Sequence, residues 1–473
     1  MNDKKQGGKI KKELEEEVSE MNKELDKIVL SLKDDLFKKA SEIIKFKSVE
    51  GEKEDDAPFG KGVKNALNYA LEIGKKYGLT AKNVDNYAGH VEYGSDGKLF
   101  GVLGHLDVVP EGEGWSVDPY GGIIKDGYLW GRGAIDDKGP TMAALFALIA
   151  VKKLGVEPKS RVRVIFGTNE ETGWKGLKYY FKHEEMPQWG VTPDADFPII
   201  NCEKGIVNFE ISSERNSSDV VLIKGGDASN MVAAHAKAII KTEDKALIKR
   251  LNGFVPKNGA KIEAHYENGK MTVETFGKSA HGSKPDEGVN AISALFDFLV
   301  HADLADEGVK LLNEKIGYET DGKSLGIAGM DEASGKLTLN LGTVEADERN
   351  IKVVVNIRYP IFFNVDMIES QIKMALKNMQ VTPQHNQAPL YVSPDSDLIR
   401  LLSQVYEDVT HQKAYLISIG GGTYARALPN AVAFGPLFPG RESLEHQPNE
   451  RISLDDLLMV SRIYAQLLYR IIS

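Results

Sequence analysis

The sequence LFGVLGHLDVV, residues 99–109, is apolar and carries no charge until its end, which is typical of a strand buried on both faces. Near that end lie His105 and Asp107, and side chains two residues apart point to the same face of a strand. A histidine beside a carboxylate that orients it is a common arrangement for a metal ligand. A buried histidine hydrogen-bonded to a neighbouring aspartate gives the same pattern, so other motifs must decide.

Strands and helices alternate on either side of this stretch, which is typical of an α/β domain with a largely parallel sheet. A hairpin with Asp126-Gly127 as its turn is expected over residues 121–133. The helix after Asp136-Asp137-Lys138-Gly139-Pro140 has its proline in the first turn, where the missing N–H costs nothing. The other expected elements are helices 61–78, 141–154 and 173–183 and strands 81–93, 99–109, 161–166 and 197–201.

The pattern changes after Gly205, where strand-like runs surround two helical segments, 243–252 and 289–302. This indicates a smaller α+β domain with an antiparallel sheet. The α/β pattern returns from about residue 393 and ends in a helix over 454–472. The expected fold is therefore α/β, with a mainly parallel-sheet catalytic domain (1–204 and 389–473) and an inserted α+β lid domain on an antiparallel sheet (205–388).

The first 36 residues are rich in charge. Residues 1–8 are expected to be disordered, and an apolar stripe from Ile10 to Leu36 at spacings of three and four predicts one face of a helix. This face would pack on the protein's own body or, alternatively, on a partner helix.

Composition excludes several classes of function. The 473 residues carry a net charge of −10, which argues against a nucleic-acid partner because phosphate binding needs a basic surface. The single cysteine, Cys202, excludes an internal disulfide and favours a cytoplasmic location. Neither a secretory signal nor a membrane span is expected from the hydropathy pattern.

Four further stretches carry acids or a histidine where turns or strand ends are expected: GRGAIDDKG (131–139), GTNEETG (167–173), TPDAD (192–196) and EHQPNE (445–450). Open α/β sheets place their sites at such strand ends. Two imidazoles and three or more carboxylates without cysteine suit a pair of Zn²⁺ or Mn²⁺ ions, which would need one bridging carboxylate.

Two acidic pairs stand out within these stretches. Neighbours in an extended segment point in opposite directions, so one of Glu170 and Glu171 could bind a metal while the other takes a proton from water. An exposed acidic pair in a loop would look the same, and Asp136-Asp137 alone would be typical of a helix N-cap.

In chain order, GHLDVVP, WGRGAIDDKGP, TNEETG, PDA and EHQPNE resemble the motifs of the co-catalytic dinuclear zinc peptidase family. That family includes carnosinases, aminoacylases, glutamate carboxypeptidases and desuccinylases, and the resemblance covers nearly all of the chain after residue 30. Within the family, EETGWKGLKYYFKHE, PDADFPIINCEKG and GGGTYAR are most similar to bacterial PepV-type dipeptidases.

The resemblance implies a role for each motif residue. Asp136 would bridge two metal ions, with a cis peptide bond after it, which costs about 3–4 kcal/mol in a non-proline residue. Asp107 would orient His105, and Glu170 would be the general base. Other branches of the family use an acid further along the chain than Asp194, which would be Glu203 here. The implied metal ligands are His105, Asp136, Glu171, Asp194 and His446.

The resemblance also assigns substrate contacts to the inserted domain. His281 in KSAHG would stabilise the oxyanion, Asn230 in SNMVA would help to bind it, and Arg358 in NIRYP would bind the substrate carboxylate. A structural salt bridge is the alternative for Arg358. In dimeric relatives the histidine comes from the partner subunit, whereas PepV-type enzymes supply it from an enlarged inserted domain, so a monomer with an intramolecular lid is expected.

The resulting hypothesis is a cytoplasmic, metal-dependent dipeptidase that hydrolyses short unblocked peptides. A metal-bridged hydroxide would attack the scissile carbonyl, with Glu170 as general base. The cofactors would be two divalent ions, Zn²⁺ or Mn²⁺, and the only partner a small peptide, with neither nucleic acid nor membrane. The alternatives are an N-acyl-amino-acid amidohydrolase or desuccinylase with the same dinuclear site, and a non-catalytic peptide-binding relative.

Overall fold

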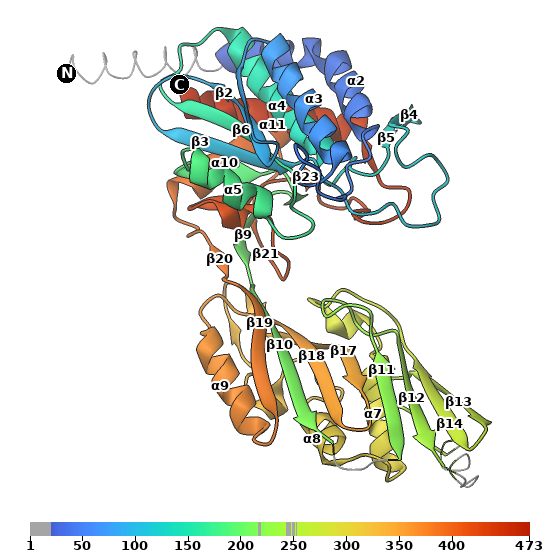
Figure 1. Cartoon of the computed structure of the whole chain (residues 1–473). Coiled ribbons are helices and arrows are strands. Elements are labelled where there is room, and N and C mark those ends of the chain that lie inside the picture. Colours follow the sequence, from blue (N-terminus) through green and yellow to red (C-terminus); the bar gives the residue numbers. More distant parts are fainter. Residues whose placement is uncertain (1–19, 216–218, 243–246, 248–250, 252) are drawn as a thin grey trace, which may run out of the picture. The chain divides into compact units, whose positions relative to one another are not determined.

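The computed structural model describes residues 20–215, 219–242, 247, 251 and 253–473. The chain divides into two compact units (Figure 1). Of the described residues, the first unit comprises 20–201, Val392–Ile417 and Thr423–Ser473, and the second comprises those within Cys202–Tyr391 together with Ser418–Gly422. The predicted disorder of residues 1–8 and most of the predicted helix 243–252 lie outside the described residues.

A mixed sheet with the strand order β1-β2-β6-β3-β7-β22-β9 forms the centre of the first unit. The same nine-stranded sheet also contains β21, paired to β9, and β20, whose two residues belong to the second unit. The central pairs β6·β3, β3·β7 and β7·β22 are parallel, whereas β1·β2, β2·β6, β22·β9 and β9·β20 are antiparallel. The prediction of a mainly parallel sheet is therefore correct only for the central strands, and the sheet as a whole is mixed. The strands are β1 (Thr80–Val84), β2 (Ala88–Tyr93), β3 (Leu99–His105), β6 (Arg161–Gly167), β7 (Trp189–Thr192), β9 (Ile199–Glu203), β20 (Leu390–Tyr391), β21 (Leu416–Ile419) and β22 (Ala431–Ala433).

The antiparallel edge of this sheet has a local cause. The predicted strand 81–93 is two strands, β1 and β2, joined by a tight turn in which Asp85 and Asn86 have φ values of 51° and 59°. Strands joined by so short a turn must run antiparallel, whereas parallel pairing needs a crossover of a dozen or more residues. Aspartate and asparagine tolerate this left-handed conformation better than most residues.

Helix α4 (Lys138–Leu154) is the central helix of the first unit, and its residues are buried from Lys138 through Val151. It packs on β3, β6 and the C-terminal helix α11 (Leu454–Ile472). A helix that is apolar on all sides is one enclosed by other elements. The described part of this unit also contains helical residues 20–31 and the helices α2 (Lys33–Ile44), α3 (Lys61–Lys76), α5 (Lys175–His183) and α10 (Asp397–Thr410). None of the described helices has the length and apolar character needed to span a bilayer.

The described part of the N-terminal stripe packs on the protein's own body. Leu25, Val29, Leu32 and Leu36 are buried, and Asp26 forms an ion pair with Arg462 of α11 at 2.6 Å. The predicted intramolecular packing therefore holds for this part, and residues 10–19 lie outside the described residues.

His90 on β2 is buried beneath α5, where its Nδ1 lies 2.8 Å from the hydroxyl of Tyr180. Burial, and then the positive charge of Arg163, lower the pKa of His90 to about 3. An unfolded histidine titrates near pH 6.5, so between pH 3 and 6.5 the unfolded chain binds the extra proton. His90 therefore costs stability progressively as pH falls below about 6.5.

We expect this cost to be about 2 kcal/mol at pH 5, since each pH unit below 6.5 is worth about 1.4 kcal/mol. The wild type and His90→Gln are compared by the decrease in their free energy of unfolding when the pH is lowered from 7 to 5. This decrease should be about 2 kcal/mol smaller in His90→Gln than in the wild type. Urea unfolding of both proteins at both pH values measures it. Equal losses in the two proteins would contradict the assignment.

The second unit is built on an eight-stranded, wholly antiparallel sheet in the order β13-β14-β12-β11-β17-β18-β10-β19 (Figure 1). Helix α7 (Ala291–His301) packs on β12, β14 and β17. This confirms the predicted antiparallel α+β pattern. The strands of this sheet are β10 (Gly205–Glu214), β11 (Val220–Gly225), β12 (His235–Lys241), β13 (Lys261–Glu267), β14 (Lys270–Phe276), β17 (Thr338–Ala346), β18 (Asn350–Tyr359) and β19 (Gln380–Gln387). Two further α-helices of the unit are α8 (Glu307–Lys315) and α9 (Val365–Ala375).

Candidate metal centre

His105 is the last residue of β3, so Asp107 lies in the following loop and the same-face argument for the two residues is wrong. The structure brings them together by another route. The Nδ1 of His105 lies 3.0 Å from the backbone oxygen of Asp107 and 3.6 Å from its carboxylate. A hydrogen bond donated by Nδ1 to that carbonyl leaves Nε2 as the free ligand atom.

Asp136 lies in the loop before α4, and the peptide bond that follows it is cis, as the resemblance predicts. Its two carboxylate oxygens face different imidazoles. Oδ1 is 2.9 Å from Nε2 of His105, and Oδ2 is 2.9 Å from Nε2 of His446. One carboxylate between two histidines is the arrangement that a bridging metal ligand requires.

Helix α4 approaches β3 closely enough to hold Asp136 near His105. The carboxylate of Asp137 accepts hydrogen bonds from the Thr141 hydroxyl at 2.9 Å and the backbone N–H of His105 at 3.2 Å. A Cβ atom at Gly104 would come within 2.0 Å of that Thr141 hydroxyl, so this close approach requires glycine.

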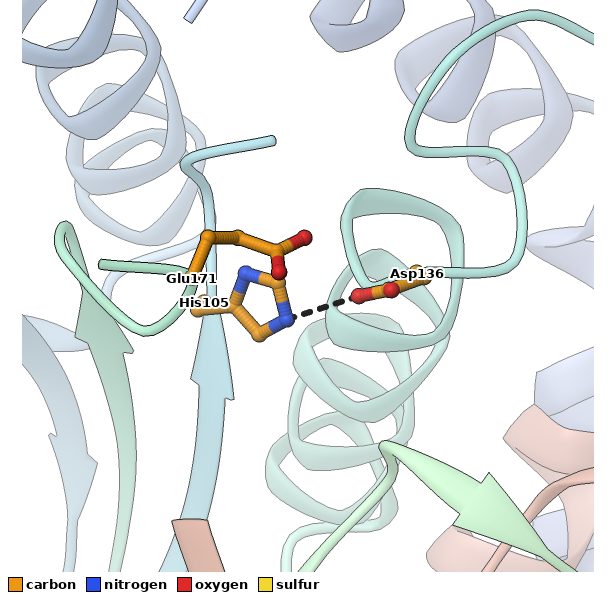
Figure 2. Close-up of side chains that lie close together, drawn as sticks. All are labelled: His105, Asp136 and Glu171. Carbon is orange, nitrogen blue, oxygen red and sulfur yellow. Dashed lines mark ion pairs between the residues drawn. The ribbon is translucent and has the colours of Figure 1, made fainter. Parts of the chain in front are cut away.

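Glu170 and Glu171 lie in a turn after β6 rather than in an extended segment, yet their carboxylates have separate partners. Glu171 Oε2 is 3.3 Å from Nε2 of His446, whereas Glu170 Oε1 accepts a hydrogen bond from the indole N–H of Trp174 at 3.0 Å. Figure 2 shows Glu171 beside the facing pair of His105 and Asp136.

Within the described part of the chain, two groups of side chains bring their ligand atoms within 4.8 Å of one another: His105 with Asp136 and Glu171, and His105 with Glu170 and Asp194. Asp194 Oδ2 is 3.6 Å from Nε2 of His105. Glu203, the alternative to Asp194, is a buried residue at the end of β9 in the second unit. The geometry of the first unit therefore favours Asp194 as the acid on the His105 side.

The cluster concentrates negative charge. Burial, together with the charge of Asp136, raises the pKa of Asp194 to about 7, and burial raises the pKa of Glu170 well above its ordinary value. Hydrogen bonds that the imidazole of His446 donates to the carboxylates of Asp136 and Glu171 raise its pKa to about 11. For His105, burial alone would lower the pKa, but the side chains of Asp107, Asp136 and Asp194 raise it well above its ordinary value.

The chemistry of the donor set fits divalent cations. Among the described residues, Glu171 Oε1 and Asp107 Oδ1 are buried without a hydrogen-bond partner, and buried carboxylate oxygens are normally paired. Imidazole nitrogens and carboxylate oxygens without sulfur suit Zn²⁺ or Mn²⁺. A metal ion held by these atoms would satisfy them and offset the accumulated charge.

Sequence reasoning missed two aromatic residues of this site. Tyr424 is buried in GGGTYAR, with its ring centroid 5.9 Å from that of His105 and 5.5 Å from that of Trp174. It packs so closely on β6 that a Cβ atom at Gly167 would come within 2.4 Å of its ring. The motifs EETGWKG and GGGTYAR were the available signals, but neither suggested that the two aromatic rings meet beside the candidate base.

Trp174 is predicted to orient Glu170. Trp174→Phe keeps an aromatic ring beside Tyr424 but removes the donor to Glu170, and a hydrogen bond to a charged group is worth about 1.5–3 kcal/mol. We expect kcat to fall at least tenfold, with a much smaller change in KM. Steady-state kinetics at saturating metal tests this, with Trp130→Phe in the hairpin of β4 (Ile123–Lys125) and β5 (Tyr128–Trp130) as the matched control. An unchanged kcat would contradict the role.

In the second unit, Asn230 and His281 lie side by side. Met231 and His281 form an isolated β-bridge, and the backbone oxygen of Asn230 accepts a hydrogen bond from the N–H of Gly282 at 2.7 Å. His281 Nδ1 also lies 2.6 Å from the hydroxyl of Ser283. The segments SNMVA and KSAHG, distant in sequence, are therefore one local structure.

A chain of amides connects Arg358 on β18 to the same local structure. Arg358 Nε donates to Asn356 at 2.8 Å, Asn356 donates to Asn208 at 2.6 Å, and Asn208 donates to the Ser229 hydroxyl at 3.2 Å. Arg358 also donates to the backbone oxygen of Gly420 at 2.7 Å. The second unit thus brings all three predicted substrate-contacting residues into one hydrogen-bonded region.

The fold and this cluster define a class: α/β proteins with histidine and carboxylate ligands for divalent metal ions at the ends of the strands. The chain belongs to Peptidase family M20/M25/M40, whose family model matches residues 101–470.

Relatives and solved structures agree with this membership. The chain is 42% identical over 464 residues to "Putative dipeptidase YtjP" of Bacillus subtilis (strain 168), covering 95% of this chain and 100% of that protein. It is 35% identical to a "Putative dipeptidase" of Staphylococcus epidermidis, covering 88% and 92%. The fold is similar to that of human carnosine dipeptidase 1, with a TM-score of 0.56 and 16% identity, covering 95% of this chain and 99% of that chain.

Proposed function

We propose that this chain is a metal-dependent dipeptidase that hydrolyses the peptide bond of short unblocked peptides. The observation that carries the proposal is the position of Asp136, whose two carboxylate oxygens each face a different histidine within a family of peptidases. The relatives named as dipeptidases, which match over almost their full length, support the choice of dipeptides as substrates.

The residues would divide the work as follows. His105 and Asp194 would hold one divalent ion, Zn²⁺ or Mn²⁺, Glu171 and His446 would hold a second, and Asp136 would bridge them. When bound, two such ions lower the pKa of a water between them and polarise a carbonyl oxygen. Glu170 would take the proton of the attacking water and pass it to the leaving amine, with Trp174 holding the orientation of its carboxylate.

The second unit is proposed to act as a lid, with a domain insertion at residues 205–388. His281 and Asn230 would stabilise the oxyanion and Arg358 would bind the substrate carboxylate, because these residues match the family motifs and lie in one hydrogen-bonded region. Lid closure of this kind excludes water from the reaction and completes the site. A single chain would then contain every group that the reaction needs.

A substrate panel tests the proposal. The purified protein would be chelated and then assayed with a dipeptide, a tripeptide, an N-acetyl amino acid and N-succinyl-diaminopimelate, each with and without added Zn²⁺ or Mn²⁺. We expect metal-restored cleavage of the dipeptide. Cleavage of the acylated substrates alone would replace the dipeptidase with an amidohydrolase or desuccinylase of the same site. Metal binding without any turnover would indicate a binding module.

A further inference from the structure

The loop that carries Asp136 is joined to the segment that carries His446. Strand β24 (Arg451–Ser453) pairs antiparallel with β5 (Tyr128–Trp130), with Arg451 opposite Trp130. The N–H of Gly131 continues this ladder by donating to the backbone oxygen of Glu450 at 3.0 Å. The register therefore places Glu450 directly beside the loop 131–136.

The side chain of Glu450 is fully buried, with 0% of its surface exposed, and holds the backbone of that loop. Oε1 accepts hydrogen bonds from the N–H groups of Gly133 at 3.0 Å, Ile135 at 2.9 Å and Asp136 at 3.2 Å. Successive N–H groups that converge on one oxygen form an anion-binding concavity. Here its occupant is a carboxylate of the chain itself, and one of the three donors is Asp136.

The other oxygen of Glu450 binds Arg132, which is also buried, at 2.6 Å. The guanidinium of Arg132 extends the contact to two more segments. Nη1 lies 3.4 Å from the backbone oxygen of Gln447, the residue after His446, and Nη2 donates to the backbone oxygen of Glu111 at 3.2 Å. The pair of Arg132 and Glu450 therefore touches the segments of both Asp136 and His446.

The ligands on the other side of the cluster have different supports. His105 ends β3 and is oriented by the backbone of Asp107, and Asp194 lies two residues after β7. Within the described residues, the side-chain hydrogen bonds of Glu450 reach Arg132 and the loop 133–136 but neither His105 nor Asp194. Loss of the buried pair should therefore affect the two sides of the cluster unequally.

We propose that Glu450 and Arg132 are positioning residues that hold Asp136 and His446 at the spacing required by the metal ion on the His446 side. The inference rests on the proposed dinuclear site and deepens it. Neither residue is a ligand, and both act through the backbone of the loops that carry ligands. Residues that orient ligands in this way typically change metal affinity by about 10- to 100-fold when substituted.

The test is a calorimetric titration of chelated full-length protein with Mn²⁺ alone. Glu450→Gln keeps the shape of the side chain but places an amide NH₂ against either the three N–H groups or the guanidinium. We expect the second equivalent of Mn²⁺ to bind about 10- to 100-fold more weakly than in wild type, and the first equivalent, which Asp136 also binds, to be weakened clearly less. Excess Mn²⁺ should restore kcat with unchanged KM.

Glu92→Gln is the matched control, because Glu92 forms a similar, largely buried ion pair with Arg163 at 2.6 Å. It should leave both Mn²⁺ affinities unchanged. If Glu450→Gln does not fold, Arg132→Lys retains the backbone contacts of Glu450 and should weaken the second equivalent more than the first. Equal weakening of both equivalents, or none, in a folded variant overturns the inference. Failure of wild type to bind two equivalents would instead overturn the proposed dinuclear site.

Discussion

Glu170→Gln is expected to lower kcat by about 10²- to 10⁴-fold, the range that a positioned general base contributes. The amide keeps the size of the side chain and can still accept the Trp174 hydrogen bond seen at 3.0 Å, but it cannot take a proton from water. Burial raises the pKa of Glu170, which is the direction that makes a carboxylate a stronger base.

Measuring the amount of metal bound distinguishes loss of the general base from damage to the metal site. The Glu170→Gln protein should bind metal nearly as wild type does, because the roles proposed for Glu170 and the ligand Glu171 are distinct. Glu157→Gln, an exposed position after α4, is the control for the chemical change. If Glu170→Gln kept more than a tenth of the wild-type kcat, the base would have to be another group.

The sequence predicts the candidate cluster better than it predicts the path of the backbone through it. His105, Asp136, Glu171 and Asp194 were named from motifs, and the structure brings them together even though β3 ends before Asp107 and Glu170-Glu171 lie in a turn. Motif residues carry their chemistry whatever the local conformation, whereas strand ends depend on pairing with neighbours that are distant in sequence.

Elements that depend on distant pairing were the hardest to predict. Strand β12, with the sequence HAKAIIK, lies between β11 and β14, but its alanines have low strand propensity. In the eight-stranded sheet of the second unit, four strands were not among the strand-like runs recognised in the sequence: β12, β13, β17 and β19. The role of Glu450 was hidden for a similar reason, since its partners Gly133, Ile135 and Asp136 lie more than 300 positions away.

Asp136→Asn is expected to remove metal-dependent stability altogether, because the amide replaces one of the two oxygens that face His105 and His446 at 2.9 Å. A ligand that binds only the folded state at 100 times its Kd stabilises it by about 2.7 kcal/mol. Chelation of wild type should therefore lower the free energy of unfolding by about that amount for each ion bound, and added Zn²⁺ or Mn²⁺ should restore it.

In Asp136→Asn the difference between chelated and metal-supplied protein should fall to near zero, and turnover should be lost with it. The comparison of chelated proteins isolates any damage to the fold, because no metal contributes to either value. Asp96→Asn, an exposed position between β2 and β3, should keep the full metal response. A variant at Asp136 that still gained stability from metal would show that this carboxylate does not bridge, and the ligands would have to form separate, independent sites.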